Sequence, residues 1–472
     1  MAGFSFLFPQ APQADRSRPP QLGAPPSLIL PAIRKVTLSN GIPVVVMEKR
    51  GVPLVQMNLT FRAGAALEPA DKIGLASMTA AMLREGAGGR NSLELADAID
   101  YLGATVNTVA DTQSLSVSLH TPLSKLDAAF ALFADIVLRP AFPAGELERL
   151  RKERLTTLVQ WYDQPTMVAS VAAGKYVFGE AHPYGRSAIG RESTLRALTA
   201  EDVQGFYGRH CHAGNAFFVV VGDIAASEMA ARLEKAFGGW KKGESVPVRI
   251  PTAPQVSGST VYLIDKANAP QSVIRIARVG ADRLTRDYFP LLVANTILGG
   301  SFSSRLNNNL REQHGYTYGA GSSFDMRISA GAFTASSSVQ TAVTDKALAE
   351  FFREFRRMAE PVPEAELSRA KNYLALGYPG DFETVAEVAG RLGEMVYYGL
   401  PDEYFQRYIP DVLAVSQEDV QRVARQYIDP AHIAVILVGD RKAVQKGLEE
   451  LNVGKIVPLT IEDVLGRMPV LQ

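Results

Sequence analysis

The sequence predicts an α+β protein of two tandem homologous domains, each an antiparallel sheet layered with helices. The chain of 472 residues contains an internal repeat whose copies lie about 220 residues apart, too long a period for a solenoid. Each copy has strand-like segments, then amphipathic helical segments, and then a closing apolar strand, at residues 217–221 and 433–438. The length also exceeds what one hydrophobic core usually serves, which favours two domains.

Short motifs recur in the same order in both copies, and these matches define the repeat. They are Pro-x-x-Glu-Leu-x-Arg at 143–149 and 363–369, Glu-Asp-Val-Gln at 201–204 and 418–421, and Val-Gly-Asp at 221–223 and 438–440. The near-constant offset indicates one ancestral unit copied in tandem. We therefore expect two similar domains.

Composition divides the chain into four segments. Residues 1–32 form a Pro-rich leader that we expect to be flexible, with the first strand beginning at Val36. Residues 33–240 form the first predicted domain, and residues 260–472 form the second. Between them, residues 241–259 have the Pro, Gly and Ser content of a linker.

The charge balance excludes several classes of partner. Lys and Arg together number 49, as do Asp and Glu, so the chain offers no general attraction for nucleic acid or an acidic membrane. No run of about 18 apolar residues is present to span a bilayer. We expect a soluble protein with protein or peptide partners. Cys211 is the only cysteine and no signal peptide is visible, so the compartment, cytoplasmic or periplasmic, stays open.

Residues 74–83 read GLASMTAAML, and their surroundings make this segment informative. Upstream come a strand, an Asn40-Gly41 hairpin turn, a second strand, and an alternating strand that leads into the helix. Taken alone, the segment could be any Ala-rich amphipathic helix. With these neighbours it resembles the metal-binding helix of the inverted-zinc-motif (M16, pitrilysin-like) metallopeptidases, usually written GLAHFLEHML. The resemblance extends over about residues 33 to 470, and two-domain members of that family have a clam-shell form with substrate between the halves.

The residues that hold zinc in that motif are missing from this chain. Ser77 and Ala81 stand where the two histidines would be, and Ala80 stands where the glutamate that activates water would be. The family's third ligand is a glutamate on a later helix, and the resemblance puts Gln160 at that position, within about one turn. We predict no metal and no cofactor in this chain, and we expect zinc on a partner subunit.

His210-Cys211-His212 is the one cluster of other potential ligands. Alternation along an extended segment could point both imidazoles the same way. The same positions align with Tyr427 and Asp429 of the second copy, so a structural role before the closing strand is favoured.

A second family element lies in the second half, in SFSSRLNNNLREQHGYTYGAGSSF. This segment resembles the one in which an arginine and a tyrosine seven residues later line the active chamber, and here these are Arg311 and Tyr318. A phenol and a guanidinium can hold a peptide and stabilise the oxyanion that forms during hydrolysis. Without this resemblance, Arg311 would be interpreted as a solvated residue at a helix end, and Tyr318 would be interpreted as a half-buried aromatic residue on a strand.

Neighbouring residues have weaker predicted roles. Tyr316 would share a strand face with Tyr318 and is a further candidate for binding substrate. Residues 307–309, all Asn, and His314 are expected to be turn and surface residues. In the first half, residues 103–108 resemble the sheet edge to which family members add substrate as a strand, which makes Asn107 a substrate-binding candidate.

The sequence thus predicts the non-zinc-binding subunit of a heteromeric M16 peptidase. A homologous subunit with the His-x-x-Glu-His motif would be its partner, in a heterodimer or larger assembly, and unfolded peptides its substrates. The alternative is a catalytically inert structural or binding homologue, similar to the zinc-free core proteins of respiratory complexes. Arg311 and Tyr318 favour the first, because a scaffold has no need of either residue. A lone metallopeptidase is disfavoured by the missing ligands.

Overall fold

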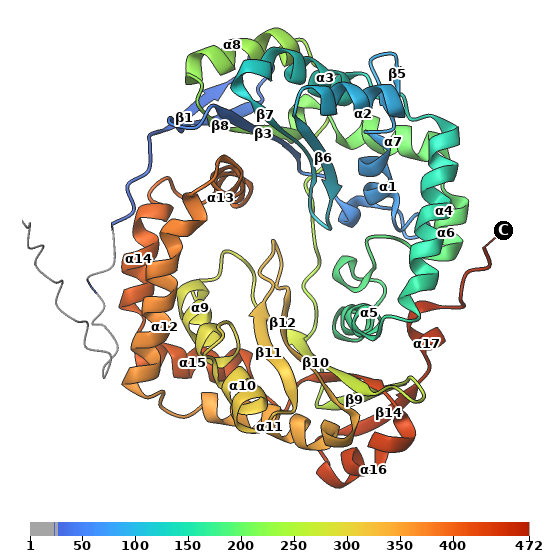
Figure 1. The fold of residues 1–472 in the computed structure, drawn as a ribbon, viewed down its shortest axis with the longest axis vertical. Helices are drawn as coiled ribbons and strands as arrows, with labels where there is room; N and C mark the ends of the chain where they lie inside the picture. The colour runs from blue at the N-terminus through green and yellow to red at the C-terminus, as the bar shows by residue number, and fades with distance from the viewer. Residues whose placement is uncertain (1–22, 24–26, 472) are drawn as a thin grey trace, which may run out of the picture.

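The computed structural model describes residue 23 and residues 27–471, and these form two halves that each contain a six-stranded sheet (Figure 1). The α+β class and the two-domain fold predicted from the sequence are confirmed. Most of the predicted leader lies outside the described residues. The first strand begins at Ile33, three residues before the predicted start.

The first half contains the elements from β1 to α8. They are β1 (Ile33–Thr37), β2 (Pro43–Glu48), β3 (Leu54–Phe61), α1 (Leu75–Met82), β4 (Gly86–Ala87), β5 (Arg90–Asn91), α2 (Ser92–Tyr101), β6 (Thr105–Ala110), β7 (Leu115–Pro122), α3 (Leu126–Leu138), α4 (Ala144–Trp161), α5 (Pro165–Phe178), α6 (Glu192–Ala197), α7 (Ala200–His210), β8 (Ala216–Gly222) and α8 (Ala226–Phe237).

The second half contains the elements from β9 to α17. They are β9 (Thr260–Asp265), β10 (Gln271–Val279), α9 (Tyr288–Leu298), α10 (Arg305–Asn307), the π-helical turn η5 (Asn308–Gln313), β11 (Thr317–Phe324), β12 (Ala332–Gln340), α11 (Thr344–Met358), α12 (Glu364–Gly377), α13 (Val385–Tyr398), α14 (Tyr404–Ala414), α15 (Gln417–Tyr427), β13 (Ala434–Gly439), α16 (Arg441–Leu451), β14 (Lys455–Leu459) and α17 (Ile461–Leu465).

The two sheets are mixed, although the sequence predicted antiparallel ones. The strand order is β1-β2-β8-β3-β7-β6 in the first sheet and β11-β12-β10-β13-β9-β14 in the second. β2 pairs with β8 in parallel, and β9 pairs in parallel with both β13 and β14. The other pairings are antiparallel, including the predicted β1–β2 hairpin, where Gly41 has a φ of 91°. Such long-range parallel pairings have no local turn signal, which is why the sequence did not predict them.

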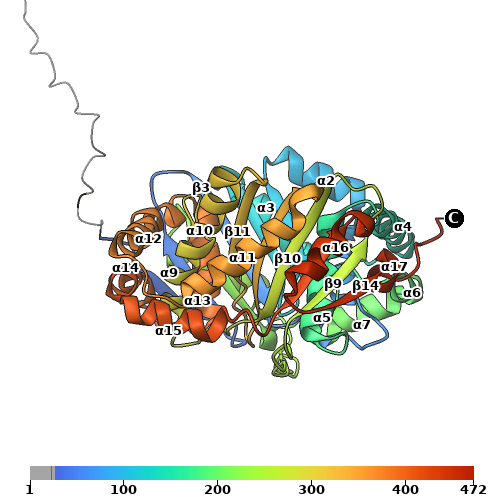
Figure 2. The same cartoon turned by 90° about the horizontal axis from the view of Figure 1, so that it is seen from below.

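Each sheet has an outer face covered by helices and an inner face that points toward the other half. On β3, Val55, Met57, Leu59 and Phe61 are buried in the core shared with α1, α3, α7 and α8. The alternate side chains include polar ones, as the period of two requires. Seen from below, α11 and α16 lie across the outer face of the second sheet (Figure 2).

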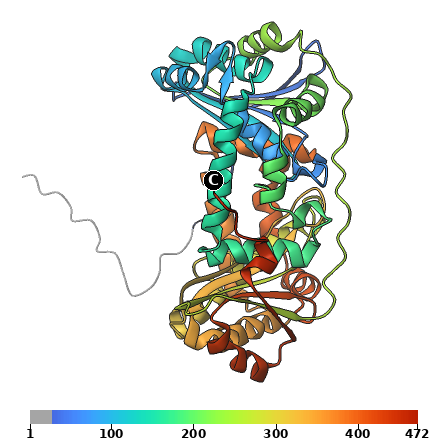
Figure 3. The same cartoon turned by 90° about the vertical axis from the view of Figure 1, so that its right-hand side faces the viewer.

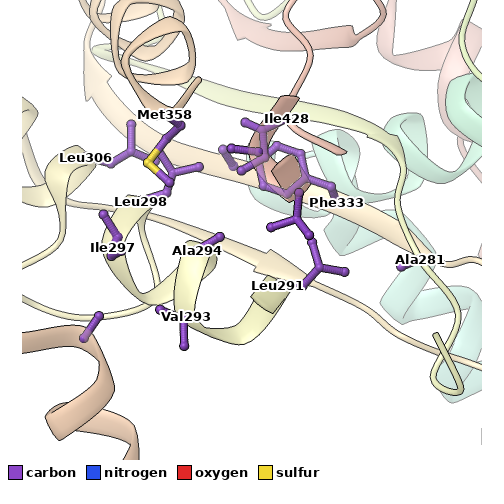
Figure 4. Close-up of a cluster of buried hydrophobic side chains, with 14 of the residues drawn as sticks. Ala281, Leu291, Val293, Ala294, Ile297, Leu298, Leu306, Phe333, Met358 and Ile428 are labelled. Carbon is purple, nitrogen blue, oxygen red and sulfur yellow. The ribbon is translucent and has the colours of Figure 1, made fainter. Parts of the chain in front are cut away.

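The core of the second half is built mainly from aliphatic side chains. α9 places Leu291, Ala294 and Leu298 in it, where they are fully buried beside Phe333 of β12 (Figure 4). This helix is apolar on nearly all sides, as expected for one enclosed between a sheet and other helices. The segment that carries Arg311 follows directly after this helix.

The halves exchange one helix each across the molecule. α5, from the first half, packs on β10 and β13 of the second sheet, and α13, from the second half, packs on β3 and β8 of the first. Arg62 on the first half strengthens this exchange, because its guanidinium donates hydrogen bonds to the carbonyl oxygens of Val396 and Tyr397 at 3.0 and 2.7 Å. The packing therefore ties the two halves together at both sides of the space between them.

Residues 241–259 run along one side of the molecule from the first half to the second and contain no helix or strand (Figure 3). The boundaries of the two predicted domains stay a prediction. Because α5 and α13 each pack on the sheet of the other half, the helices that cover each sheet do not all come from the same half of the sequence.

The repeat is visible in the caps of equivalent helices. Thr199 accepts a hydrogen bond from the backbone N–H of Asp202 at the start of α7, and Ser416 accepts one from Asp419 at the start of α15. In both cases the aspartate carboxylate accepts a hydrogen bond from the backbone N–H of the cap residue, which completes a capping box. No helix in the described part of the chain combines the length and the apolar character needed to cross a membrane.

Candidate functional site

The degenerate zinc motif lies on α1, and its side chains pack instead of presenting ligands. Ala80 is only 1% exposed and belongs to the core of the first half. Ala81 is half-buried against the same core. Ser77 hydrogen-bonds to the carbonyl oxygen of Ala188 at 2.5 Å, and its hydroxyl accepts a hydrogen bond from Arg154 at 2.8 Å. Residues 77, 80 and 81 therefore do not fit a zinc ion.

Arg154 and Glu68 both hydrogen-bond to the start of α1, an arrangement that the sequence did not predict. Glu68 accepts hydrogen bonds from the backbone N–H groups of Gly74 and Ala76 at 3.1 and 2.7 Å. Burial raises the pKa of the Glu68 carboxyl to about 7 and lowers the pKa of the Arg154 guanidinium to about 10. A guanidinium at Ser77 opposes the binding of a second cation there. No sequence signal indicated this pair, because its members lie far apart in the chain.

Gln160 lies in the last turn of α4, where it is exposed to solvent. Arg154 marks the side of α4 that faces α1, and a side chain six residues further along the helix lies about 120° away from that side. Leu158, four residues from Arg154, lies within about 40° of it. The structure thus places Leu158 closer to the side of α4 that faces the motif than Gln160.

His210, Cys211 and His212 are all buried. Burial lowers the pKa of His210 to about 4, and burial raises the pKa of the Cys211 thiol well above its ordinary value. A raised thiol pKa opposes the thiolate form that binds metals. Within residue 23 and residues 27–471, no three side chains of His, Cys, Asp or Glu form a group able to hold a metal ion.

Arg311 lies on the π-helical turn η5. Single π-helical turns are rare and are often found at functional sites. The guanidinium carbon of Arg311 lies 4.7 Å from the centroid of the Phe302 ring, and Nε lies 3.3 Å from Glu312 Oε1. The side chain is partly exposed, so these contacts orient the guanidinium without enclosing it.

Tyr318 lies on β11, which is an edge strand of the second sheet, and its side chain is 91% exposed. The alternative interpretation of Tyr318 as a half-buried aromatic residue is therefore wrong. The pairing register of β11 with β12 shifts between Thr317 and Ala320, because the edge strand contains one extra residue there. A bulge of this kind redirects a side chain away from the regular sheet face.

Three side chains fix this bulge. The Ser337 hydroxyl donates to the carbonyl oxygen of Gly319 at 2.9 Å, and the Thr317 hydroxyl donates to the carbonyl oxygen of Ser338 at 2.7 Å. Asn307 connects α10 to β11, because its amide donates to Phe302 O at 2.7 Å and its oxygen accepts from Ala320 N at 3.3 Å. The bulge is thus held from both sides.

The sequence predicted turn and surface roles for residues 307–309, and this was wrong for two of them. Asn307 is 4% exposed and Asn309 is 3% exposed. Asn309 donates to Glu350 and Glu354, both at 2.7 Å. Amides are buried here because they satisfy backbone and carboxylate groups where the helix geometry is irregular. His314 is exposed, as predicted.

Arg311, Tyr316 and Tyr318 line one cavity of about 520 Å³ at this edge of the second sheet. Gln271, Thr317 and Gln340 also line it, so its polar side-chain groups are a guanidinium, two phenols, two amides and a hydroxyl. Tyr316 precedes β11 and stacks on His314, with ring centroids 4.9 Å apart. The structure thus brings together three of the four predicted substrate-binding residues.

The fourth, Asn107, is on the first sheet. It is exposed on β6, the edge strand next to β7, and β6 also packs against α1. The cavity with Arg311 and Tyr318 includes neither Asn107 nor a residue of α1. β6 and β11 each leave one side of their backbone unpaired by a neighbouring strand, so both are open to β-augmentation by a peptide.

Comparison with known proteins identifies two matching family models. The model described as Insulinase (Peptidase family M16) matches residues 44–171, and the model described as Peptidase M16 inactive domain matches residues 197–374. Together they cover parts of both halves of the molecule.

Individual relatives agree with these matches. A Rickettsia bellii protein named an uncharacterized zinc protease is 25% identical over 359 residues, which is 76% of this chain and 85% of the relative. The Helicobacter pylori protein named non-peptidase homolog YmxG is 22% identical, with 85% of this chain and 92% of the relative covered. The crystal structure of a peptidase M16 inactive domain from Pseudomonas fluorescens aligns with a TM-score of 0.81 at 26% identity, covering 86% of this chain and 98% of that one.

Proposed function

Since the chain belongs to the M16 peptidase family, we propose that it is the non-zinc-binding subunit of a two-chain M16 metallopeptidase. A homologous chain with the His-x-x-Glu-His motif supplies the zinc, and this chain supplies Arg311 and Tyr318. One observation carries the proposal. Arg311 and Tyr318 both line an accessible cavity at an open sheet edge, whereas on α1 Ala80 is packed in the core and Ser77 accepts a hydrogen bond from Arg154.

The proposed roles follow from the chemistry of the two side chains. When bound to the partner, zinc would supply a Lewis acid for the hydrolysis. Peptide hydrolysis places negative charge on the carbonyl oxygen, and the phenol of Tyr318 donates a hydrogen bond to that oxygen. Arg311 provides a fixed positive charge and several donors that hold the peptide backbone beside it. Donors fixed before the reaction stabilise charge without reorganisation, so the bulge that fixes the backbone around Tyr318 belongs to the mechanism.

The open edges of β6 and β11 support peptides as the substrate class. A peptide that adds to a sheet edge is recognised through its backbone, so many sequences are accepted. Such a peptide must be extended, which favours unfolded segments over folded proteins. Asn107, exposed on β6, is in a position to contact the side chains or ends of a peptide added there.

A second candidate function is an inert scaffold or binding subunit. It is favoured by the name of the Helicobacter pylori relative, a non-peptidase homolog. The two functions differ in whether Arg311 and Tyr318 affect turnover, and this difference can be measured.

The test is to purify the chain alone, the His-x-x-Glu-His homologue alone, and the mixture, and to assay cleavage of unfolded peptides. Only the mixture is expected to be active. In the mixture, Arg311→Ala and Tyr318→Phe should each lower kcat/KM by roughly 100-fold or more, as loss of an oxyanion donor does. Assembly and the zinc content of the partner should not change.

Matched variants control for nonspecific effects. Tyr101, on α2, is 86% exposed, so Tyr101→Phe removes a similarly exposed phenol outside the cavity. His314→Ala is a second control near the cavity. Both should retain wild-type turnover. If neither Arg311→Ala nor Tyr318→Phe changes turnover, or if the partner is equally active alone, the catalytic proposal fails and the scaffold is favoured.

A further inference from the structure

A second polar cavity lies between α5 and the inner face of the second sheet, and it is separate from the cavity with Arg311. Its volume is about 320 Å³, at the lower end of the roughly 300–1,000 Å³ of ligand pockets. Gly174 and Phe178 of α5 form one wall, and Arg275, Ser323 and Thr334 of the sheet form the other. The cavity exists because α5 crosses from the first half onto this sheet.

Arg275 faces this cavity because of strand alternation. Ile274 and Ile276, on either side of it in β10, are fully buried in the core on the opposite face. Arg275 pairs across the sheet with Ser336 of β12 and Ile436 of β13. A guanidinium thus lies on the central part of an inner sheet face. An apolar side chain at this position would pack equally well.

The guanidinium has no counter-charge within the described residues. Its Nε is shielded from solvent and has no hydrogen-bond partner among them. Burial lowers the pKa of Arg275, and no carboxylate acts in the other direction. Arg278, on the other face of β10, also has an Nε without a partner, but it donates to Asp429 O at 3.1 Å and has the Asp429 carboxylate beside it as a counter-charge.

The other charged groups of the cavity cancel each other. Arg327 and Asp325 form an ion pair at 2.5 Å, and the Arg327 guanidinium also lies 4.7 Å from the Tyr184 ring centroid. Arg275 therefore leaves the cavity with one net positive charge. Ser323 and Thr334, whose hydroxyls lie 3.1 Å apart, add neutral donors beside it.

We propose that this cavity is a subsite for a peptide carboxylate, bound by Arg275 and assisted by the hydroxyls of Ser323 and Thr334. A guanidinium binds a carboxylate through two parallel hydrogen bonds, and the pair is strongest where solvent is excluded. The inference rests on the proposed function, since it assumes that peptides enter the space between the halves. It adds that a peptide is anchored by a charge at one end, while the sheet edges bind its backbone.

The test measures binding of fluorescent peptides to the isolated chain, so it does not depend on catalysis. Three peptides share one sequence without other acidic residues. One ends in a free carboxylate, one ends in a carboxamide, and one has the carboxamide and a single internal aspartate. The free carboxylate should bind roughly 10-fold more tightly than the neutral peptide, as a charge-assisted hydrogen bond implies. Tight binding of the aspartate peptide assigns the subsite to any carboxylate, and weak binding assigns it to the peptide terminus.

Variants of the chain identify the residue responsible. Arg275→Gln should remove the preference for the carboxylate, and Arg275→Lys should keep part of it, because the charge remains and the bidentate geometry is lost. Thr334→Asp places a competing carboxylate on the cavity wall and should remove the preference while Arg275 is kept. Arg209→Gln, on the exposed side of α7, removes the same charge elsewhere and should leave the preference unchanged.

Equal affinity of the wild-type chain for the carboxylate and the carboxamide would overturn the inference. So would a preference that survives in both Arg275→Gln and Thr334→Asp. Turnover of the neutral peptide by the mixed complex reports on the proposed function alone, because that peptide has no carboxylate for Arg275 to bind. Absence of turnover in every mixture would remove the proposed function without deciding the question of Arg275.

Discussion

Rebuilding the zinc motif in this chain should not produce a protease, and the structure gives the reason. The change is Ser77→His, Ala80→Glu and Ala81→His, which returns two imidazoles and a carboxylate to α1. Ala80 is 1% exposed in the core of the first half. Ser77 already accepts a hydrogen bond from Arg154 at 2.8 Å. The new side chains thus enter a packed region that also contains a buried cation.

The expected cost follows from these surroundings. Overpacking of a well-packed core costs about 1–3 kcal/mol. A buried charge without a partner costs about 3–5 kcal/mol more. The free energy of unfolding of the first half should therefore fall by roughly 4–8 kcal/mol. At about 2–4 °C per kcal/mol for a domain of this size, its melting temperature should fall by roughly 10–30 °C. The single change Ala80→Glu should account for most of this loss.

Zinc affinity provides the second readout, and it also tests the position of the third ligand. The triple variant is compared with two quadruple variants, one with Gln160→Glu and one with Leu158→Glu. Because Leu158 lies within about 40° of the side of α4 marked by Arg154, Leu158→Glu should raise zinc affinity more than Gln160→Glu. Both are measured by competition with a metal chelator, beside thermal unfolding and peptide cleavage without the partner.

Two results would refute this reasoning. A triple variant that melts like the wild type and cleaves peptides as fast as the mixed complex would show that α1 accepts a metal site without cost. A larger gain in zinc affinity from Gln160→Glu would show that the sequence placed the third ligand correctly and that the face of α4 inferred from Arg154 is wrong.

The remaining predictions concern metal content, pH and the bulge. Elemental analysis of the isolated, dialysed chain should find well below one zinc per chain, and one tightly held zinc would contradict the loss of ligands at Ser77, Ala80 and Ala81. Burial raises the pKa of Glu68 to about 7, so the folded state keeps a proton that the unfolded state releases above about pH 4.5, and stability should fall as pH rises from about 4.5 to 7. Glu68→Gln should remove up to about 3 kcal/mol of this dependence, seen as melting curves of the two proteins that diverge across that window. Ser337→Ala, which removes one of the donors to Gly319 O, should lower turnover of the mixed complex with little change in melting temperature, while a clear fall in melting temperature as well would mean that the hydroxyl serves folding.

Local chemistry explains which features could be predicted from the sequence. The capping residues Thr199 and Ser416, each followed by an aspartate three positions later, define helix starts within a few residues. The Asn40-Gly41 turn similarly indicates a hairpin, because glycine accepts the positive φ found there. Each of these signals operates over a handful of residues, so each is readable in the sequence.

The features that could not be predicted depend on contacts between distant segments. The crossing of α5 and α13 onto the opposite sheets has no local signal, and both helices would look the same if they packed on their own half. The same is true of Arg154, whose partners Ser77 and Glu68 lie more than 70 residues away. Asn307 and Asn309 were misjudged because polar residues are usually exposed, and burial of an amide depends on acceptors and donors that only the fold supplies.

The two segments that resemble family motifs, α1 in the first half and the segment with Arg311 and Tyr318 in the second, differ in how far packing explains their residues. On α1, the motif positions have become packing positions, and folding alone explains Ala80. Folding does not explain Tyr318 in the same way. Its side chain is 91% exposed, so it buries little apolar surface, and it lies in a bulge that gives up regular ladder hydrogen bonds on an edge strand. Exposure alone does not distinguish it, because Tyr101 is 86% exposed as well; Tyr318 is distinguished by the bulge, whose backbone Ser337 and Thr317 hold in place. The residue makes physical sense if the phenol meets something outside this chain, and the occupant that we propose is a peptide beside a partner's zinc.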